Sequence, residues 1–279
     1  MNNILITGGT GFFGRTFTRY LLENNLANKI CIYSRDEYKQ SVMKHDFVDD
    51  RMRFFIGDVR DRSRLTRACR DIDIVVHAAA LKRIEVGHYA PEEMVQTNVY
   101  GAMNVVDAAY DAGVKKVVAL STDKAYQPIS PYGQTKALAE SLFLAANASH
   151  IGPKYSVVRY GNVWKSTGSI VPVWLDLLSR GVPRVPVTDP DCTRFFMTAD
   201  EACSLVWQAV EELPKEVLIP DWLPAYRVGD LAAAMGAEMA VGRLPSWEKK
   251  HESMNDDLCS ETARRMTVGE LQGFLDDSV

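Results

Sequence analysis

The chain has 279 residues, of which 32 are Lys or Arg and 36 are Asp or Glu, giving a formal net charge of -4. This length suffices to bury a full core, and the 47% hydrophobic content is ordinary for a soluble globular protein. The acidic balance gives no support to a nucleic-acid-binding function. No apolar run approaches the ~20 residues of a membrane-spanning helix.

The five cysteines are scattered and form no C-x-x-C pair. Their spacing argues against a zinc site or a disulfide framework and indicates a reducing compartment. The first apolar run is short and leads directly into glycines, so we expect no signal peptide. Together these features predict a cytoplasmic protein without a metal site.

Short β-branched runs alternate with amphipathic stretches through the first half of the chain. Strands are expected at residues 3–7, 29–34, 52–56, 72–77, 116–121 and 155–160, and helices at 12–23, 37–44, 62–70, 91–112 and 132–148. Strands that are apolar on both faces and separated by helices predict an α/β fold with a Rossmann-like, doubly wound parallel sheet.

The regularity falls after about Gly161, where prolines divide the chain into short elements. We therefore expect a Rossmann domain over residues 1–165, which also carries the catalytic residues. A smaller, partly interleaved substrate-binding lobe is expected over residues 166–279. Within that lobe, Thr267 followed by Glu270 resembles a capping box and predicts a terminal helix.

A glycine-rich turn joins the first expected strand to the first helix. Gly8, Gly11 and Gly14 form a G-x-x-G-x-x-G pattern that lets the backbone approach a pyrophosphate at the helix N-terminus. An ordinary glycine-rich turn is the plain alternative, but the strand-to-helix context favours dinucleotide binding. The cofactor contacts expected here are those of Gly8, Thr10, Gly11, Phe12, Phe13 and Gly14.

The end of the second strand carries Ser34 and Arg35, where an NAD site usually has an acidic residue. A hydroxyl group and a guanidinium suit the 2′-phosphate of NADP, so NADP is favoured over NAD. The adjacent Asp36 keeps NAD open. Further cofactor contacts are expected from Asp58, Val59, Ala78, Ala79, Ala80, Lys82, Asn98, Tyr132 and Lys136, the last of these holding the nicotinamide ribose.

The strongest chemical signal follows the fifth strand. Tyr132 and Lys136 are four residues apart and face one side of a helix, where an ammonium group beside a phenol favours proton transfer. Tyr132 would exchange this proton with a hydroxyl group of the substrate, and Thr122 is placed to hydrogen-bond that hydroxyl group. Asp123 and Lys124 add a carboxyl and an amine, which suit acid–base elimination, although a surface ion pair is the plain alternative.

Seven stretches together resemble the inverting UDP-N-acetylglucosamine 4,6-dehydratases, the C5-epimerising enzymes of pseudaminic acid and capsule-sugar pathways within the extended short-chain dehydrogenases. The similarity covers roughly residues 3–210, and its most specific motif is T-D-K with a tyrosine nine positions after the aspartate. The stretches are ILITGGTGFFG, YSRDEYKQ, MRFFIGDVRD, HAAALKRIEVGHYAP, ALSTDKAYQPISPYGQTK, VVRYGNVWKSTGSIVP and TRFFMT.

The resemblance implies functional roles. Asp123, Lys124 and Tyr132 match the catalytic trio, and Thr122 and Lys136 match supporting positions. It also implies a UDP-sugar substrate, a tightly held NADP and a homo-oligomer, from dimer to hexamer. Positions expected to face the nucleotide-sugar are Lys82, Asn162, Ser169, Arg194 and Arg243.

Three positions depart from the family pattern. Phe12 stands where a serine is usual, and Trp164 replaces a smaller residue beside Asn162, which predicts a reshaped sugar pocket. The C-terminal R-P-G-E-K-x-H-E segment is only echoed by residues 244–252, and its arginine is either missing or displaced to Arg243. Two alternatives stay open: a nucleotide-sugar 4-epimerase or related sugar-modifying enzyme on the same scaffold, and a non-catalytic NADP-sensing protein.

Overall fold

The computed structural model describes residues 2–148 and 151–276, which divide into two compact units. The first comprises Met1–Arg159 with Ala199–Ile219, and the second comprises Tyr160–Thr198 with Pro220–Val279. The chain therefore leaves the first unit after the sixth strand, returns to it for one helix and leaves again. We describe each unit by itself.

The first unit is built on a six-stranded parallel sheet of order β3-β2-β1-β4-β5-β6, the doubly wound arrangement expected from the sequence. The strands are β1 (Asn2–Thr7), β2 (Ala27–Ser34), β3 (Met52–Ile56), β4 (Ile74–His77), β5 (Lys116–Leu120) and β6 (Lys154–Val158). Strand β1 pairs in parallel with both β2 and β4, so the order reverses at the centre of the sheet. Ligands of such sheets bind at the carboxyl ends of the strands near this reversal.

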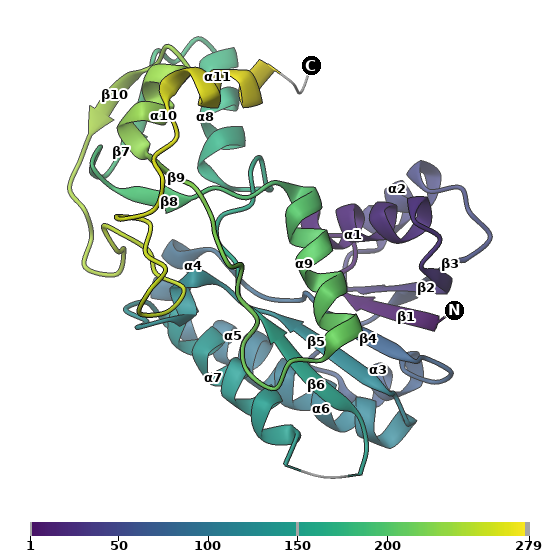
Figure 1. The fold of residues 1–279 in the computed structure, drawn as a ribbon. Coiled ribbons are helices and arrows are strands. Elements are labelled where there is room, and N and C mark those ends of the chain that lie inside the picture. The colour runs from purple at the N-terminus through teal and green to yellow at the C-terminus, as the bar shows by residue number, and fades with distance from the viewer. Residues whose placement is uncertain (1, 149–150, 277–279) are drawn as a thin grey trace. The chain divides into compact units, whose positions relative to one another are not determined.

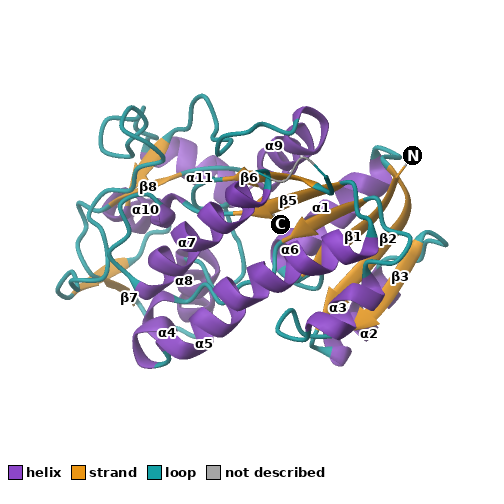
Figure 2. Ribbon diagram, turned by 90° about the horizontal axis from the view of Figure 1, so that it is seen from below, coloured by secondary structure: helices purple, strands orange, loops and turns teal. Residues whose placement is uncertain are grey.

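Helices cover both faces of this sheet (Figures 1 and 2). They are α1 (Phe12–Glu23), α2 (Glu37–Asp46), α3 (Arg62–Ala68), α4 (Ile84–Tyr89), α5 (Pro91–Met94), α6 (Gly101–Ala112), α7 (Pro131–Ala146) and α9 (Ala199–Glu212). Helices α3, α6 and α7 pack on one face over a core that includes Leu5, Val75, Val117 and Phe143. Helix α9 packs beside α1 and against β5 and β6, so a distant segment completes the other face.

The helix expected over residues 91–112 is interrupted. Helix α5 passes into a π-helical segment η1 (Val95–Tyr100) before α6 begins. Such π-helical turns are rare and are frequently found at functional sites. This one carries Asn98 on its buried side. Hydrophobic periodicity does not reveal a one-residue change in helical hydrogen bonding, so the interruption could not be predicted.

The second unit contains two small two-stranded sheets and three helices among its described residues. Its elements are α8 (Ile170–Ser179), β7 (Arg184–Val187), β8 (Thr193–Phe195), β9 (Ala225–Arg227), α10 (Val228–Ala234), β10 (Glu238–Val241) and α11 (Val268–Asp276). The predicted capping box is confirmed, because the Glu270 backbone donates to Thr267 Oγ1 and the Thr267 backbone donates to Glu270 Oε2 at 3.2 and 2.8 Å.

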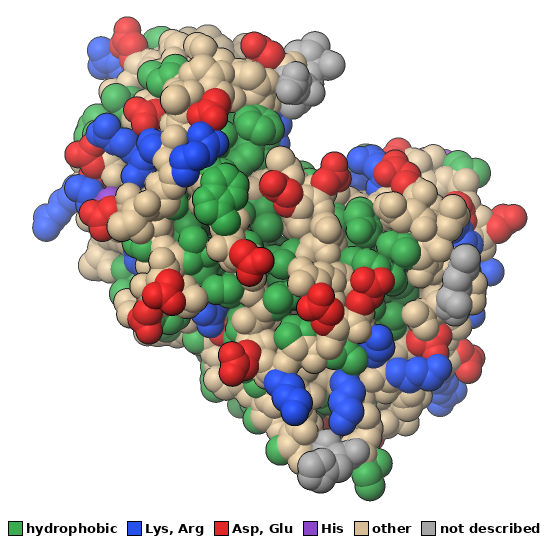
Figure 3. All heavy atoms as spheres, viewed as in Figure 1, with side chains coloured by type: hydrophobic (Ala, Val, Ile, Leu, Met, Phe, Trp, Pro, Cys, Tyr) green, Lys and Arg blue, Asp and Glu red, His purple; other side chains and the backbone are tan. Residues whose placement is uncertain are grey.

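On the face shown in Figure 3, basic and acidic side chains are both spread over the surface, with no large continuous basic area. Among residues 2–148 and 151–276, no helix is long and apolar enough to cross a membrane.

Candidate functional site

The turn after β1 has the close backbone approach that the glycine pattern predicts. Gly8 has a φ of +66°, and a Cβ there would lie 2.8 Å from the Cα of Ala79. A Cβ on Gly14 would lie 2.5 Å from the Cα of Gly9. Gly11 is the N-cap of α1, whose first turn has neither a side-chain cap nor an acidic residue. The N–H groups at this helix end therefore suit an anionic group, which fits a dinucleotide pyrophosphate.

The residues after β2 bear on the choice between NADP and NAD. Asp36 caps α2 by accepting the Lys39 backbone N–H at 2.9 Å, so this carboxylate already has a structural task. Ser34 is buried and its hydroxyl accepts from Gln40 at 3.0 Å. The half-exposed Arg35 forms a long ion pair with Asp58, at 3.6 Å. Arg35 is thus the basic group nearest in sequence to the end of β2.

Asp58 follows β3 and is already strongly engaged. It pairs with Arg60 at 2.8 Å in addition to Arg35, and these contacts hold the pKa of its carboxyl below the ordinary value despite burial. Val59 beside it is buried and would meet a Cβ placed on Gly101 of α6. Their predicted contacts with the adenine stay predictions.

The loop after β4 is held by Asn98 of η1. The Asn98 side chain accepts from the Leu81 backbone at 2.8 Å and donates to the Leu81 carbonyl at 2.9 Å and to Thr135 at 3.1 Å. Both donors of this amide are used within the protein, so Asn98 positions the loop that carries Ala78, Ala79, Ala80 and Lys82. A direct contact between Asn98 and the cofactor stays a prediction.

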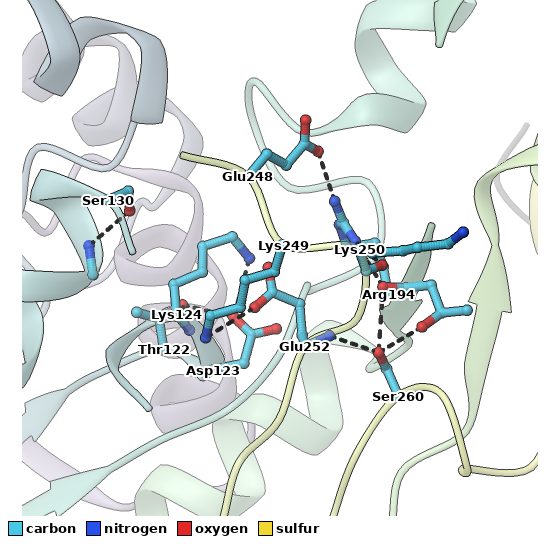
Figure 4. A network of polar contacts seen from close by, with 12 residues as sticks. Thr122, Asp123, Lys124, Ser130, Arg194, Glu248, Lys249, Lys250, Glu252 and Ser260 are labelled. Atoms are coloured by element: carbon cyan, nitrogen blue, oxygen red, sulfur yellow. Dashed lines mark hydrogen bonds and ion pairs between the residues drawn. The ribbon is translucent and has the colours of Figure 1, made fainter. Parts of the chain in front are cut away.

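Thr122, Asp123 and Lys124 form a connected group after β5 (Figure 4). The Thr122 hydroxyl and the Lys124 ammonium donate to the same carboxylate oxygen, Asp123 Oδ1, at 2.9 and 3.1 Å. Asp123 is fully buried, and its other oxygen, Oδ2, has no hydrogen-bond partner among the described residues. A buried carboxylate oxygen without a partner is costly and therefore marks a place for a ligand donor.

Tyr132 and Lys136 lie on the first turns of α7, close to this group. Both are buried, with exposed fractions of 9% and 6%. A Cβ on Gly133 would clash with the Lys124 carbonyl, so this glycine lets the start of α7 approach the Thr122–Lys124 loop. Ser130 caps the helix by accepting the Gly133 backbone N–H at 3.1 Å.

Lys136 has a distinctive electrostatic environment. Its ammonium donates to the Leu120 carbonyl at 2.6 Å, and burial lowers its pKa to about 8 although nearby Glu140 opposes the shift. His77 is also buried, and burial together with the charge of Lys136 lowers its pKa to about 3. The His77 ring contacts Thr7 Oγ1 at 2.7 Å, as a packed neutral histidine would.

Sequence reasoning missed one buried group behind the site. Glu140 lies one further turn along the Tyr132–Lys136 face of α7. It forms two hydrogen bonds with Arg159 at 3.0 and 2.6 Å and accepts the Ser121 hydroxyl. The spacing of Tyr132, Lys136 and Glu140 was a usable signal, since all three recur every four residues on one helix face.

In the second unit, Arg194 is buried and holds the segment that echoes the family's C-terminal motif (Figure 4). Its guanidinium donates to Glu248 at 2.6 Å and to the Thr193 and Lys250 carbonyls at 2.8 and 3.1 Å. The charges of Glu252 and Glu248 raise the pKa of Arg194 despite its burial. A contact between Arg194 and the nucleotide-sugar stays a prediction.

The other predicted substrate residues of this unit are spread over two loops. Asn162 and Ser169 lie between β6 and α8, where Ser169 is the N-cap of α8 and its hydroxyl is buried without a partner among the described residues. Arg243 is exposed after β10. Their contacts with a sugar nucleotide stay predictions.

Trp164 has a role in packing that the sequence did not indicate. Its ring packs against Phe196 at 5.0 Å and Phe274 at 6.4 Å between centroids, and its N–H donates to the Phe274 carbonyl at 3.2 Å. Trp164 thus fixes α11 within the second unit.

No group of His, Cys, Asp and Glu suited to a metal occurs in the part of the chain that the structure describes.

Comparison with known proteins places these features in a family. A family model described as "Polysaccharide biosynthesis protein" matches residues 4–254. The chain is 46% identical over 257 residues to UDP-N-acetylglucosamine 4,6-dehydratase (inverting) of Campylobacter jejuni, a match covering 90% of this chain and 77% of that protein. It is 37% identical over 263 residues to UDP-glucose 4-epimerase of Rickettsia prowazekii, covering 90% and 76%.

A solved structure extends the likeness to the fold. DesIV (dTDP-glucose 4,6-dehydratase) from Streptomyces venezuelae, with NAD and TYD bound, is similar with a TM-score of 0.85 and 22% identity, covering 98% of this chain and 96% of that one. The family match spans both units and includes the cradle and the β5–α7 group. The chain therefore belongs to the polysaccharide biosynthesis protein family.

Proposed function

We propose that this protein is an NADP-dependent, inverting UDP-N-acetylglucosamine 4,6-dehydratase. The observation that carries the proposal is the buried Asp123 carboxylate, which meets Lys124 through one oxygen, while the other oxygen has no hydrogen-bond partner in the described part of the chain. The similarity to the Campylobacter jejuni dehydratase supports the same function. Its product would be UDP-2-acetamido-2,6-dideoxy-L-arabino-hex-4-ulose.

The cradle residues would hold the dinucleotide. A bound nicotinamide dinucleotide would supply hydride removal from C4 of the sugar and hydride return to C6. The glycine turn and the uncapped N-terminus of α1 fit its pyrophosphate. NADP is favoured because Asp36 is committed to capping α2, whereas Arg35 can exchange its long ion pair for a 2′-phosphate.

Tyr132 would act first by taking the proton of the C4 hydroxyl group. Lys136 lies one turn further along the same helix face, where its ammonium stabilises the phenolate. Thr122 would hydrogen-bond the same sugar hydroxyl. Loss of this proton prepares C4 for oxidation, which makes the hydrogen on C5 acidic.

Lys124 would then take the C5 proton while Asp123 protonates the departing C6 hydroxyl, which leaves as water. After hydride return to C6, a proton added to C5 from the opposite face would complete the product and invert that centre. This step needs a neutral amine and a protonated carboxyl, which together hold one proton. The observed ion pair holds the same single proton, so its transfer along the 3.1 Å contact gives the reactive form. Partial desolvation and the charges of Arg83 and Lys124 lower the pKa of the exposed Lys82, so the ammonium groups of Lys82 and Lys124 repel one another.

The test is to incubate the protein with UDP-N-acetylglucosamine and follow the sugar by mass spectrometry and NMR. We expect a product lighter by one water with inverted configuration at C5. An unchanged mass, with or without a change of configuration, would overturn the proposal. Running the same assay on UDP-, TDP- and GDP-sugars would identify the nucleotide and the sugar.

The second candidate function is 4-epimerisation, favoured by the 37% identity to the Rickettsia prowazekii epimerase. Such an enzyme would change the configuration at C4 and keep the oxygen at C6, and it has no need of Lys124. We also propose that the protein is cytoplasmic and forms a homo-oligomer, from dimer to hexamer. Light scattering on the purified protein would measure the subunit number.

A further inference from the structure

A buried ionic group lies behind the proposed catalytic residues. Glu140 and Arg159 pair with side-chain exposed fractions of 8% and 11%, and their contact joins α7 to the end of β6. Removing one partner of a buried pair leaves an uncompensated charge, so the Glu140 carboxylate and the Arg159 guanidinium depend on each other.

The carboxylate of Glu140 also fixes the end of β5. Ser121, the residue before Thr122, donates its hydroxyl to Glu140 Oε1, and its backbone donates to the Val158 carbonyl of β6 at 2.6 Å. The Arg159 guanidinium lies 5.5 Å from the centroid of the Tyr126 ring, on the other side of the Thr122–Lys124 loop in the sequence. The same ionic group therefore touches both ends of that loop.

Glu140 and Lys136 are four residues apart on α7, and the negative charge of the Glu140 carboxylate raises the pKa of Lys136. Two further described neighbours of Lys136 carry no negative charge: His77 of β4 is buried with a lowered pKa, and Leu120 of β5 offers its carbonyl. Glu140 is therefore the acidic group that keeps the buried ammonium charged against the cost of burial.

We infer that Glu140 is a positioning residue, whose carboxylate, oriented by Arg159, holds Ser121 in place and preserves the charge of Lys136 beside Tyr132. This inference rests on the proposed function. A purely structural pin between α7 and β6 would use the same ion pair but would leave the charge state of Lys136 unchanged.

The test compares pH profiles. In the wild type, we expect turnover to fall as the pH rises through about 8, because Lys136 then loses its proton. In Glu140→Gln the ammonium loses its acidic neighbour, so this alkaline limb moves down by roughly one pH unit. Glu140→Asp keeps the charge and should keep the limb in place. Asp73→Asn, which removes the 2.7 Å pair with Lys115 before β5, is the control for simple loss of an ion pair.

An unmoved limb in Glu140→Gln, with only a lowered Tm, would overturn the inference and leave a structural pin. If Glu140→Gln does not fold, the double variant Glu140→Gln/Arg159→Met removes both buried charges and is read in the same way. Affinity for NADP measured over the same pH range gives a readout without turnover. A wild type without product would reject the proposed function alone, and the affinity profile would then decide this inference.

Discussion

The cradle after β1 and the polar group after β5 lie at the same carboxyl edge of one sheet, but the first is formed by backbone and the second by side chains. The cradle consists of glycine backbone, and its Cβ positions are blocked by neighbouring backbone atoms at Gly8 and Gly14. The group after β5 consists of buried side chains, including Asp123, Lys136 and Glu140. Cofactor binding by the backbone cradle should therefore be lost when an atom is added to a glycine. Catalysis by the side chains after β5 should be lost when a charge or a proton is removed.

The largest effect is expected from removing the charge of Lys124. Lys124→Met keeps an aliphatic side chain but removes the base, so dehydration should fall by about 10³-fold. The measurement is formation of the dehydrated sugar by mass spectrometry. Lys115→Met is the matched control, because Lys115 is exposed and pairs with Asp73 immediately before the same strand. Full dehydratase activity in Lys124→Met would show that dehydration does not need the amine of Lys124.

The next effect tests the cradle by adding one carbon. Alanine usually stabilises a helix relative to glycine, but Gly14→Ala places its Cβ 2.5 Å from the Cα of Gly9. Backbone cannot move aside easily, so we expect a loss of about 2 kcal/mol in the free energy of unfolding and weaker NADP binding. Chemical denaturation and titration with NADP would measure both.

Gly273→Ala is the control for this change. Gly273 lies in α11, where a Cβ meets no atom within 4 Å, so alanine should leave stability unchanged or raise it. If Gly14→Ala behaves like Gly273→Ala, the turn after β1 is looser than its geometry indicates, and shape does not define that site.

This contrast also explains what the sequence could predict. The sheet and its helices follow from local periodicity, and the cradle follows from glycines that are adjacent in the chain. The capping box at Thr267 and Glu270 was equally local and is confirmed. In each case the interacting residues are near one another in sequence, so their pattern is visible without coordinates.

The missed features depend on residues that are far apart in the chain. Glu140 meets Arg159 across α7 and β6, and Trp164 meets Phe274 across 110 residues. The reshaped sugar pocket expected from Trp164 beside Asn162 stays a prediction, whereas its contact with Phe274 leaves no local signal in the sequence. The return of α9 to the first sheet has the same character, since nothing local distinguishes it from a helix of the second unit.

A third prediction concerns the pH dependence of the free energy of unfolding that arises from His77 at the end of β4. The pKa of His77 is lowered to about 3 in the folded protein, below its ordinary value of 6.5. The unfolded chain therefore binds one more proton than the folded protein between these two values, and stability falls as the pH decreases through this range. We expect a loss of about 2 kcal/mol between roughly pH 6.5 and pH 5 from this residue.

His77→Gln should remove this part of the pH dependence, whereas His45→Gln, at an exposed position of α2, should retain it. Denaturant unfolding at several pH values gives the measurement. Identical pH slopes for the wild type and His77→Gln would show that His77 does not stay neutral on folding.

The smallest effect tests the one position where a charge serves the cradle side of the sheet. Arg35 is half-exposed and its ion pair with Asp58 is long, at 3.6 Å, so its guanidinium can turn toward a 2′-phosphate. Arg35→Ala should weaken NADP binding about tenfold and leave NAD binding nearly unchanged, because only NADP carries that phosphate. Arg60→Ala is the matched control, because Arg60 also pairs with Asp58 and forms a second ion pair with Glu93 at 3.0 Å. Calorimetric titration of both variants with both cofactors separates the cases. Equal losses for NADP and NAD in Arg35→Ala would show that Arg35 supports Asp58 rather than the phosphate, and the cradle would then depend on backbone shape alone.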